Sequence, residues 1–461
     1  MRAQEAVAIS PPAGATSPGQ PQRSPEEIFA ALRAREASLS RLLMAYISSG
    51  LVFMLFPGTF LGVWNLIQIS GRESAHSVSP AWIQAHGHAQ VFGWIGSFIL
   101  GIGFYSIPKR RGEEGGGLGA VWLCWAMWTL GAALRWMAGV YSWQWRTLLP
   151  LSSVLELAAF AIFFQAVSRH RPAEGGKPRL EPWIGVVICA TLGLLGALLA
   201  NTAISVYLAA FGRGSEIPRI LDQRYLALLG WGFLAPFVWG FSSKWMAVFL
   251  GLKPARPRLL LLAVGVSFMG IVLAIVGSIA PATLFFAAAA GLAIIALRMF
   301  EPAEGKPKTR GVHPSFPFFV RMAYGWLLVA ALLGIGAALW DSSGGIWGAS
   351  RHALTVGFVA IMVLSVGQRI LPAFAGMRLL WSTRLMFAAL ALLAVGCALR
   401  VPCEVLAYQG YAPWAWHVLP ASAVIEFAGI TAFAINIFAT FVFEPSHAAK
   451  QPLVVGIQPE R

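Results

Sequence analysis

Residues 183–211 have the sequence WIGVVICATLGLLGALLANTAISVYLAAF, which holds 29 residues and no charged side chain. A helix of about 20 mostly apolar residues is long enough to cross the hydrocarbon core of a bilayer. A buried helix of a soluble protein is shorter and interrupted by polar positions. This stretch therefore predicts a membrane-spanning helix.

The whole chain has the same character. Its 461 residues are 57% hydrophobic and 11% charged, whereas soluble proteins carry about 25% charged residues. Too few polar side chains remain to cover a globule, so most of the surface must face lipid. We predict an all-α polytopic membrane protein of about twelve transmembrane helices, near residues 42–69, 82–107, 118–140, 147–168, 183–211, 224–250, 259–279, 282–300, 316–340, 350–374, 384–407 and 413–443.

The distribution of basic residues supports this number of helices. With the N-terminus inside, alternate assignment of the segments places 23 Lys and Arg inside and six outside. Cytoplasmic loops carry such an excess of positive charge. The rule predicts cytoplasmic tails, 1–40 and 444–461, on either side of a transmembrane domain, 41–443. It also explains the net charge of +15 without a nucleic-acid partner. Ser24-Pro25-Glu26-Glu27 predicts the start of a short amphipathic helix before the first span.

An internal repeat relates three of the predicted helices. Two segments have the same spacing, and a third is weaker: His88-Ala89 with Gly93, Gly103 and Pro108; His352-Ala353 with Gly357, Gly367 and Pro372; Tyr225 with Gly230 and Gly240. The copies start 137 and 127 residues apart, which fits four helices per unit. We therefore predict three four-helix units in a pseudo-threefold arrangement.

Histidines within the spans are candidate ligands, because ionisable groups in a membrane are costly. His86 and His88 point about 200° apart on a helix, which suits two cofactors, or one ligand and one structural histidine. His352 is the repeat counterpart of His88, so the pair is expected at similar depth, where two imidazoles hold a haem iron or share copper. The alternative for these residues is an interfacial or hydrogen-bonded role. His417, at the same level, is a weaker candidate ligand.

Two arginines follow the histidines at matching distances. Arg135 lies 47 residues after His88, and Arg400 lies 48 residues after His352. A guanidinium within a membrane needs an anion, and the propionates of haem are suitable bidentate partners. Structural ion pairs are the alternative, with three glutamates available: Glu156, Glu404 and Glu426.

At His86-Gly87-His88-Ala89-Gln90-Val91-Phe92-Gly93 and His352-Ala353-Leu354-Thr355-Val356-Gly357 the chain resembles the NnrS family. This family comprises bacterial membrane proteins that contain haem and copper and are linked to the nitric oxide response. The resemblance implies haem, expected as haem b, with copper as a second cofactor. It implies axial ligation by His88 and His352, and His86 as a ligand of a second haem or of copper. The chain has Ala89-Gln90 where the family commonly has Glu-Met.

The resemblance also implies a bacterial inner membrane location, with nitric oxide and a redox protein as partners. More distantly, the chain is similar to subunit I of the haem–copper oxidases and nitric oxide reductases. Helix six lacks a histidine and helix seven lacks the paired histidines of the oxidase copper site, so oxygen reduction is not expected. A redox subunit or a haem-free transporter are the alternatives. Transporters usually show inverted repeats, whereas these run in the same direction. Whether the protein is an enzyme stays undecided.

Overall fold

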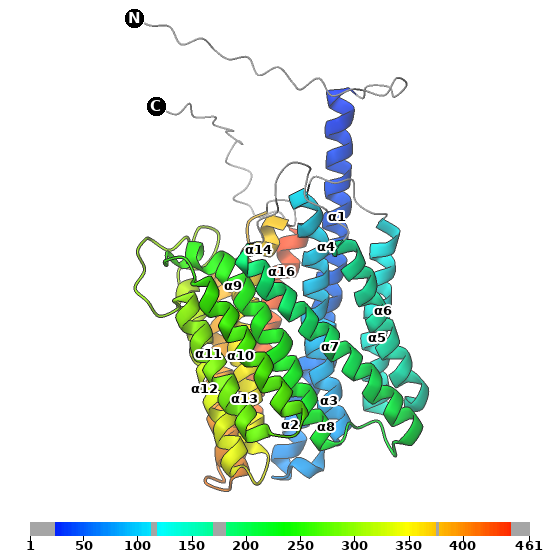
Figure 1. Cartoon of the computed structure of the whole chain (residues 1–461), viewed down its shortest axis with the longest axis vertical. Helices are drawn as coiled ribbons and strands as arrows, with labels where there is room; N and C mark the ends of the chain where they lie inside the picture. Colours follow the sequence, from blue (N-terminus) through cyan, green and yellow to red (C-terminus); the bar gives the residue numbers. More distant parts are fainter. Residues whose placement is uncertain (1–23, 112–117, 169–180, 375–377, 444–461) are drawn as a thin grey trace, which may run out of the picture.

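The computed structural model describes residues 24–111, 118–168, 181–374 and 378–443, and all regular structure in these ranges is helical (Figure 1). The predicted C-terminal tail and residues 1–23 of the N-terminal tail lie outside the described residues. In chain order the elements are α1 (Pro25–Phe53), η1 (Met54–Phe60), α2 (Leu61–Gly71), η2 (Ala75–Ser77), α3 (Pro80–His88), η3 (Ala89–Gly96), α4 (Ser97–Arg111), α5 (Leu118–Tyr141), α6 (Trp145–Ser168), α7 (Pro182–Phe211), α8 (Arg219–Ala227), η4 (Leu228–Leu234), α9 (Ala235–Leu250), α10 (Pro257–Ile275), α11 (Ile279–Leu297), α12 (Phe316–Trp340), α13 (Gly345–His352), η5 (Ala353–Ala360), α14 (Ile361–Phe374), α15 (Thr383–Tyr408) and α16 (Ala415–Val442).

Twelve helices in the described residues are long and apolar enough to cross a membrane, which confirms the predicted number. Four of them are composite, because a helix continues through a π-helical stretch: α1–η1–α2, α3–η3–α4, α8–η4–α9 and α13–η5–α14. Helix α1 begins and α16 ends at one end of the bundle, while α3, α8 and α13 begin at the other (Figure 1). We call this second end the histidine end.

The N-terminal boundary follows from the capping box. The Ser24 hydroxyl accepts a hydrogen bond from the backbone N–H of Glu27, whose carboxylate accepts one from the backbone N–H of Ser24. These bonds satisfy two of the donors that a helix N-terminus leaves free. No glycine or proline occurs between Glu26 and Ser49, so the helix continues into the first span. The short amphipathic helix that we predicted is therefore part of α1.

One boundary differs from the prediction. We expected the seventh helix to end at residue 279 and the eighth to begin at residue 282, but α10 ends at Ile275 and α11 begins at Ile279. Gly277, between them, has a φ of +93°, a backbone conformation that is open to glycine and strained for other residues. The glycine therefore ends the helix one turn earlier than hydropathy suggested.

The second, sixth and tenth spans lie at the centre of the bundle. In their most apolar windows 72%, 61% and 67% of residues are buried, against 28–56% in the other nine described spans. The remaining helices surround them, and the surround closes because α16 packs against α2. These central spans are the three that share the sequence repeat.

Each central span also contains a π-helical stretch near the repeat signature: η3 begins after His88, η5 begins after His352, and η4 begins three residues after Tyr225. A π-helical turn adds a residue to the helical repeat and shifts the faces of the helix on either side of it. The recurrence supports equivalent roles for the three spans. The division into three four-helix units stays a prediction.

Candidate functional site

His86 lies on α3 beside the first span. Its Nδ1 is 2.8 Å from the carbonyl oxygen of Gly58, in η1. Because a carbonyl only accepts, Nδ1 carries the proton and donates it. Pro57 precedes this glycine and lacks an N–H, and the π-helical turn around it lies against α3. Nε2 of His86 is therefore the acceptor, and it has no hydrogen bond among the described residues.

His352, the last residue of α13, has the same tautomer. Its Nδ1 is 2.8 Å from Oε2 of Glu404 on α15 and 3.0 Å from the carbonyl oxygen of Gly348. Nδ1 therefore donates and Nε2 accepts, and Nη2 of Arg400 donates to Nε2 at 3.0 Å. The carboxylate approaches because Gly348 has no side chain: a Cβ there would lie 2.1 Å from Oε1 of Glu404.

Two ionisable side chains, His352 and Arg400, lie within electrostatic range of the His86 ring. Both rings have Nδ1 held by an oxygen acceptor, which leaves the Nε2 atoms as the coordinating positions. Histidines that bind metals have this arrangement, because the outer hydrogen bond fixes the tautomer and the ring orientation. We call His86 and His352 the histidine pair.

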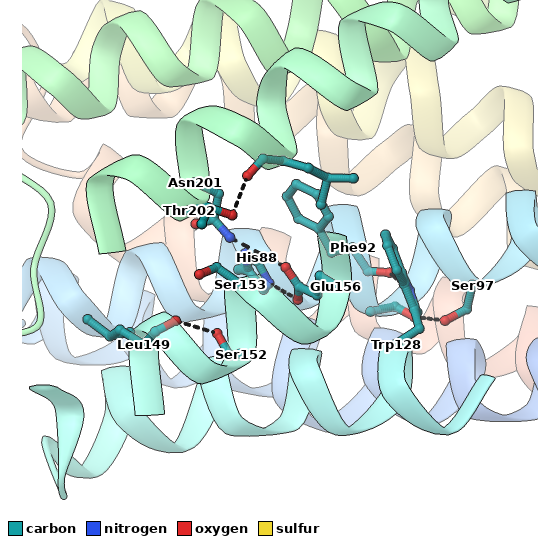
Figure 2. A network of polar contacts seen from close by, with 12 residues as sticks. His88, Phe92, Ser97, Trp128, Leu149, Ser152, Ser153, Glu156, Asn201 and Thr202 are labelled. Atoms are coloured by element: carbon teal, nitrogen blue, oxygen red, sulfur yellow. Dashed lines mark hydrogen bonds and ion pairs between the residues drawn. The ribbon is translucent and has the colours of Figure 1, made fainter. Parts of the chain in front are cut away.

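His88 points toward Glu156, as Figure 2 shows. Its Nε2 lies 2.7 Å from Oε1 of Glu156 on α6, and Nδ2 of Asn201 on α7 lies 3.4 Å from Oε2 of the same carboxylate. The ring stacks on Phe92, with 4.5 Å between ring centroids. The structure thus brings His88 together with Glu156 and Asn201.

The two predicted arginines also have different surroundings. Arg400, on α15, contacts His352 and has its Nε 3.7 Å from Glu404. Arg135, on α5, is 4% exposed and has no hydrogen bond or ion pair among the described residues. Glu426, on α16, is buried within electrostatic range of Arg400, and its Oε1 has no hydrogen bond. Arg400 therefore belongs with the histidine pair, whereas Arg135 does not.

His417 is exposed on α16, and no side-chain contact joins it to either histidine cluster. No group of three His, Cys, Asp or Glu side chains within the described ranges is arranged to hold a metal ion. The described residues therefore contain no three-ligand cluster for the predicted copper ion.

Sequence reasoning missed Gly58 and Asn201 as partners of the histidines. The sequence does contain a repeated pattern that marks the arginines and glutamates around the histidines. The segment Gly-x-Ala-Leu-Arg ends at Arg135 and Arg400, and Leu-Pro-x-Ser-x-Val-x-Glu ends at Glu156 and Glu426. In the structure, a Cβ on the glycine of each first segment would lie 2.8 Å or 2.5 Å from Cγ of the glutamate that ends the second. These segments mark two helix pairs that pack alike.

Comparison with known proteins agrees with this architecture. Residues 44–444 match the NnrS family, described as NnrS protein. No curated protein matches the chain, but 28 chains of solved structures do. One is a heme–copper terminal oxidase dimer determined by cryo-electron microscopy, with a TM-score of 0.67 and 11% identity, covering 88% of this chain and 84% of that chain. At that identity the likeness shows a shared fold. The match to the family covers most of the sequence, and the chain therefore belongs to the NnrS family.

Proposed function

We propose that the protein binds haem b through the histidine pair and acts in the cell's handling of nitric oxide. One observation carries the proposal: His86 and His352 both have Nδ1 tied to an oxygen acceptor, so that Nε2, free in His86 and bonded to Arg400 in His352, is the nitrogen able to coordinate a metal. Membership of the NnrS family supports the link to nitric oxide. The pair replaces His88 and His352, which the sequence repeat had suggested as axial ligands.

The residues around the pair fit a haem. Glu404 accepts the Nδ1 proton of His352, and a carboxylate in this position makes the imidazole more basic and a stronger ligand. Arg400 donates to Nε2 of His352. With iron held at that nitrogen, the guanidinium would have two other suitable partners, Glu426 and a haem propionate. Arg400 thus has a partner in both states.

Haem, when bound, would supply one-electron transfer. The role of this chain is to hold the rings, to fix their tautomers and to balance charge around the group. We propose a bacterial inner membrane location with both tails in the cytoplasm, which puts the histidine end toward the outside. An external donor or acceptor of electrons is the partner that such a site needs.

A ligation test uses the purified full-length protein, produced with ample haem. We expect a Soret band and a reduced-minus-oxidised α band, and a loss of most haem in H86A and in H352A. The exposed His417 offers the matched control, and H417A should retain wild-type haem content. His88 is the critical comparison, because H88A should keep the axial spectrum of the wild type.

Three outcomes are decisive against the proposal. Absence of haem bands in the wild type would remove the cofactor. Full haem content in H86A would remove the axial pair. Haem loss in H88A with retention in H86A would restore the pair that the repeat suggested. The nitric oxide role is tested separately, by survival of a deletion strain under nitric oxide with wild-type or H352A protein restored. Equal survival of the strain restored with wild-type protein and the strain restored with H352A would contradict that role.

A further inference from the structure

A buried guanidinium stands without a partner outside the histidine pair. Arg135 is 4% exposed on α5, within the third span, and no described residue hydrogen bonds or pairs with it. An unpaired charge in the membrane interior is among the most unfavourable features a protein can contain. Such a residue is expected to have an anion as its partner.

The carboxylates nearest to Arg135 do not supply that anion. Glu156 and Asp222 are within electrostatic range of the guanidinium, but neither forms an ion pair with it within 4 Å among the described contacts. Both oxygens of Glu156 already accept hydrogen bonds, from His88 and from Asn201 (Figure 2). Asp222 also lies within range of a second arginine, Arg351. The guanidinium therefore faces negative potential without a bonded oxygen.

A second buried donor without a partner lies within electrostatic range of Arg135. Tyr225, on α8, is 7% exposed, its hydroxyl has no hydrogen bond, and Arg135 is within its electrostatic range. A buried hydroxyl without a hydrogen-bond partner loses its hydration and gains no compensating hydrogen bond, which costs free energy. Two buried donors on different helices, α5 and α8, thus lack an acceptor and lie within electrostatic range of each other.

The residues around Arg135 differ from those around the histidine pair. His352 and Arg400 lie within electrostatic range of His86, whereas Tyr225, Glu156 and Asp222 lie within range of Arg135. Arg351 lies within range of both Asp222 and Glu404, so the two regions adjoin.

We propose that this region is a binding site for a small planar oxyanion, a free carboxylate or an anion of the same shape, with Arg135 as its counter-ion. A guanidinium presents a planar fork of N–H donors that matches a carboxylate in two parallel hydrogen bonds. The Tyr225 hydroxyl supplies a further donor. The carboxylates nearby disfavour a ligand with more than one negative charge. The site goes beyond the proposed haem function and does not require haem.

Formate is a suitable probe, because it is the smallest carboxylate. The unfolding temperature and the formate Kd are measured on the purified full-length protein, with chloride at equal ionic strength as the control anion. We expect saturable stabilisation by formate and none by chloride. R135Q should weaken formate binding at least about tenfold. R146Q, an exposed arginine at the histidine end that contacts the backbone of Ala209 and Gly212, should bind as the wild type does.

Two further variants keep the test decisive if R135Q does not fold. Y225F removes one hydroxyl and should weaken formate binding about three- to tenfold. D222N removes a competing negative charge and should strengthen binding. The absence of a formate response in the wild type would overturn the proposal. Equal formate affinity in R135Q or Y225F and the wild type would overturn it as well.

A haem carboxylate is the rival source of the same chemistry, and it is separated by comparing haem-free with haem-loaded protein. Equal formate binding in both forms supports a free anion. Formate binding that disappears when haem is loaded would assign Arg135 to a haem carboxylate and overturn the proposal. Failure of haem binding altogether leaves the formate result unchanged, so the two proposals fail independently.

Discussion

Two histidines two residues apart serve two separate environments in this protein. On an α-helix such residues point about 200° from each other, so His86 contacts Gly58 of η1 while His88 contacts Glu156 of α6. The sequence predicted this separation. The repeat makes His88 and His352 counterparts. The predicted rotation between the units would turn counterparts toward different interfaces, which is why we propose His86 as the partner of His352.

Replacing Glu404 by Gln tests how the carboxylate acts on the histidine pair. The Glu404 carboxylate accepts from Nδ1 of His352 at 2.8 Å, and its charge favours the oxidised form of a bound iron. E404Q should therefore raise the midpoint potential by about 60 mV, the shift that corresponds to tenfold for one electron. The measurement is a spectroscopic redox titration.

Glu301 is the matched control for this titration. It pairs with Arg256 and Arg298 outside the spans, so E301Q should leave the potential unchanged. An unchanged potential in E404Q, with haem retained, would mean that Glu404 does not act on a ligand. A lower potential would reverse the sign of the argument.

Pairs of helices in the bundle approach closely at glycines. A Cβ at Gly396 of α15 would lie 2.5 Å from Cγ of Glu426 and 2.9 Å from the carbonyl oxygen of Ser422, both on α16. The backbone oxygen cannot move aside as a flexible side chain can. Gly131 of α5 has the same surroundings on α6. Sequence reasoning detected the helices from hydropathy, but not this contact, because a glycine count does not distinguish a packed position from an open one.

Substituting alanine at Gly396 is therefore expected to destabilise the contact between α15 and α16. Overpacking of this kind costs about 1–3 kcal/mol, and thermal unfolding of the purified protein should occur at lower temperature. The matched control is Gly291 in α11, where nothing lies within 4 Å of an added Cβ; G291A should leave the unfolding temperature unchanged or raise it, since alanine favours helix. Equal behaviour of the two variants would show that α15 and α16 are not packed at this glycine.

At the scale of the whole molecule, hydropathy and charge predicted the number of spans, because both are averages over many residues. Single errors do not change such averages, and all twelve spans occur where we expected them to within a few residues. The interior contacts of the site were not predictable in this way. They depend on the rotation of each helix about its axis, and the π-helical stretches η1, η3, η4 and η5 change that rotation locally.

Orientation in the membrane decides which compartment the histidine end faces. The charge rule puts the loop between α12 and α13 outside and the loop between α11 and α12 inside. Ser342 and Lys306 are exposed in these loops, so S342C should react with a membrane-impermeant maleimide in intact cells, and K306C only after lysis. The four native cysteines lie within the spans. Their own reaction with the maleimide is measured on the wild type and subtracted. The reverse pattern would turn the histidine end toward the cytoplasm and make a cytoplasmic protein the electron partner.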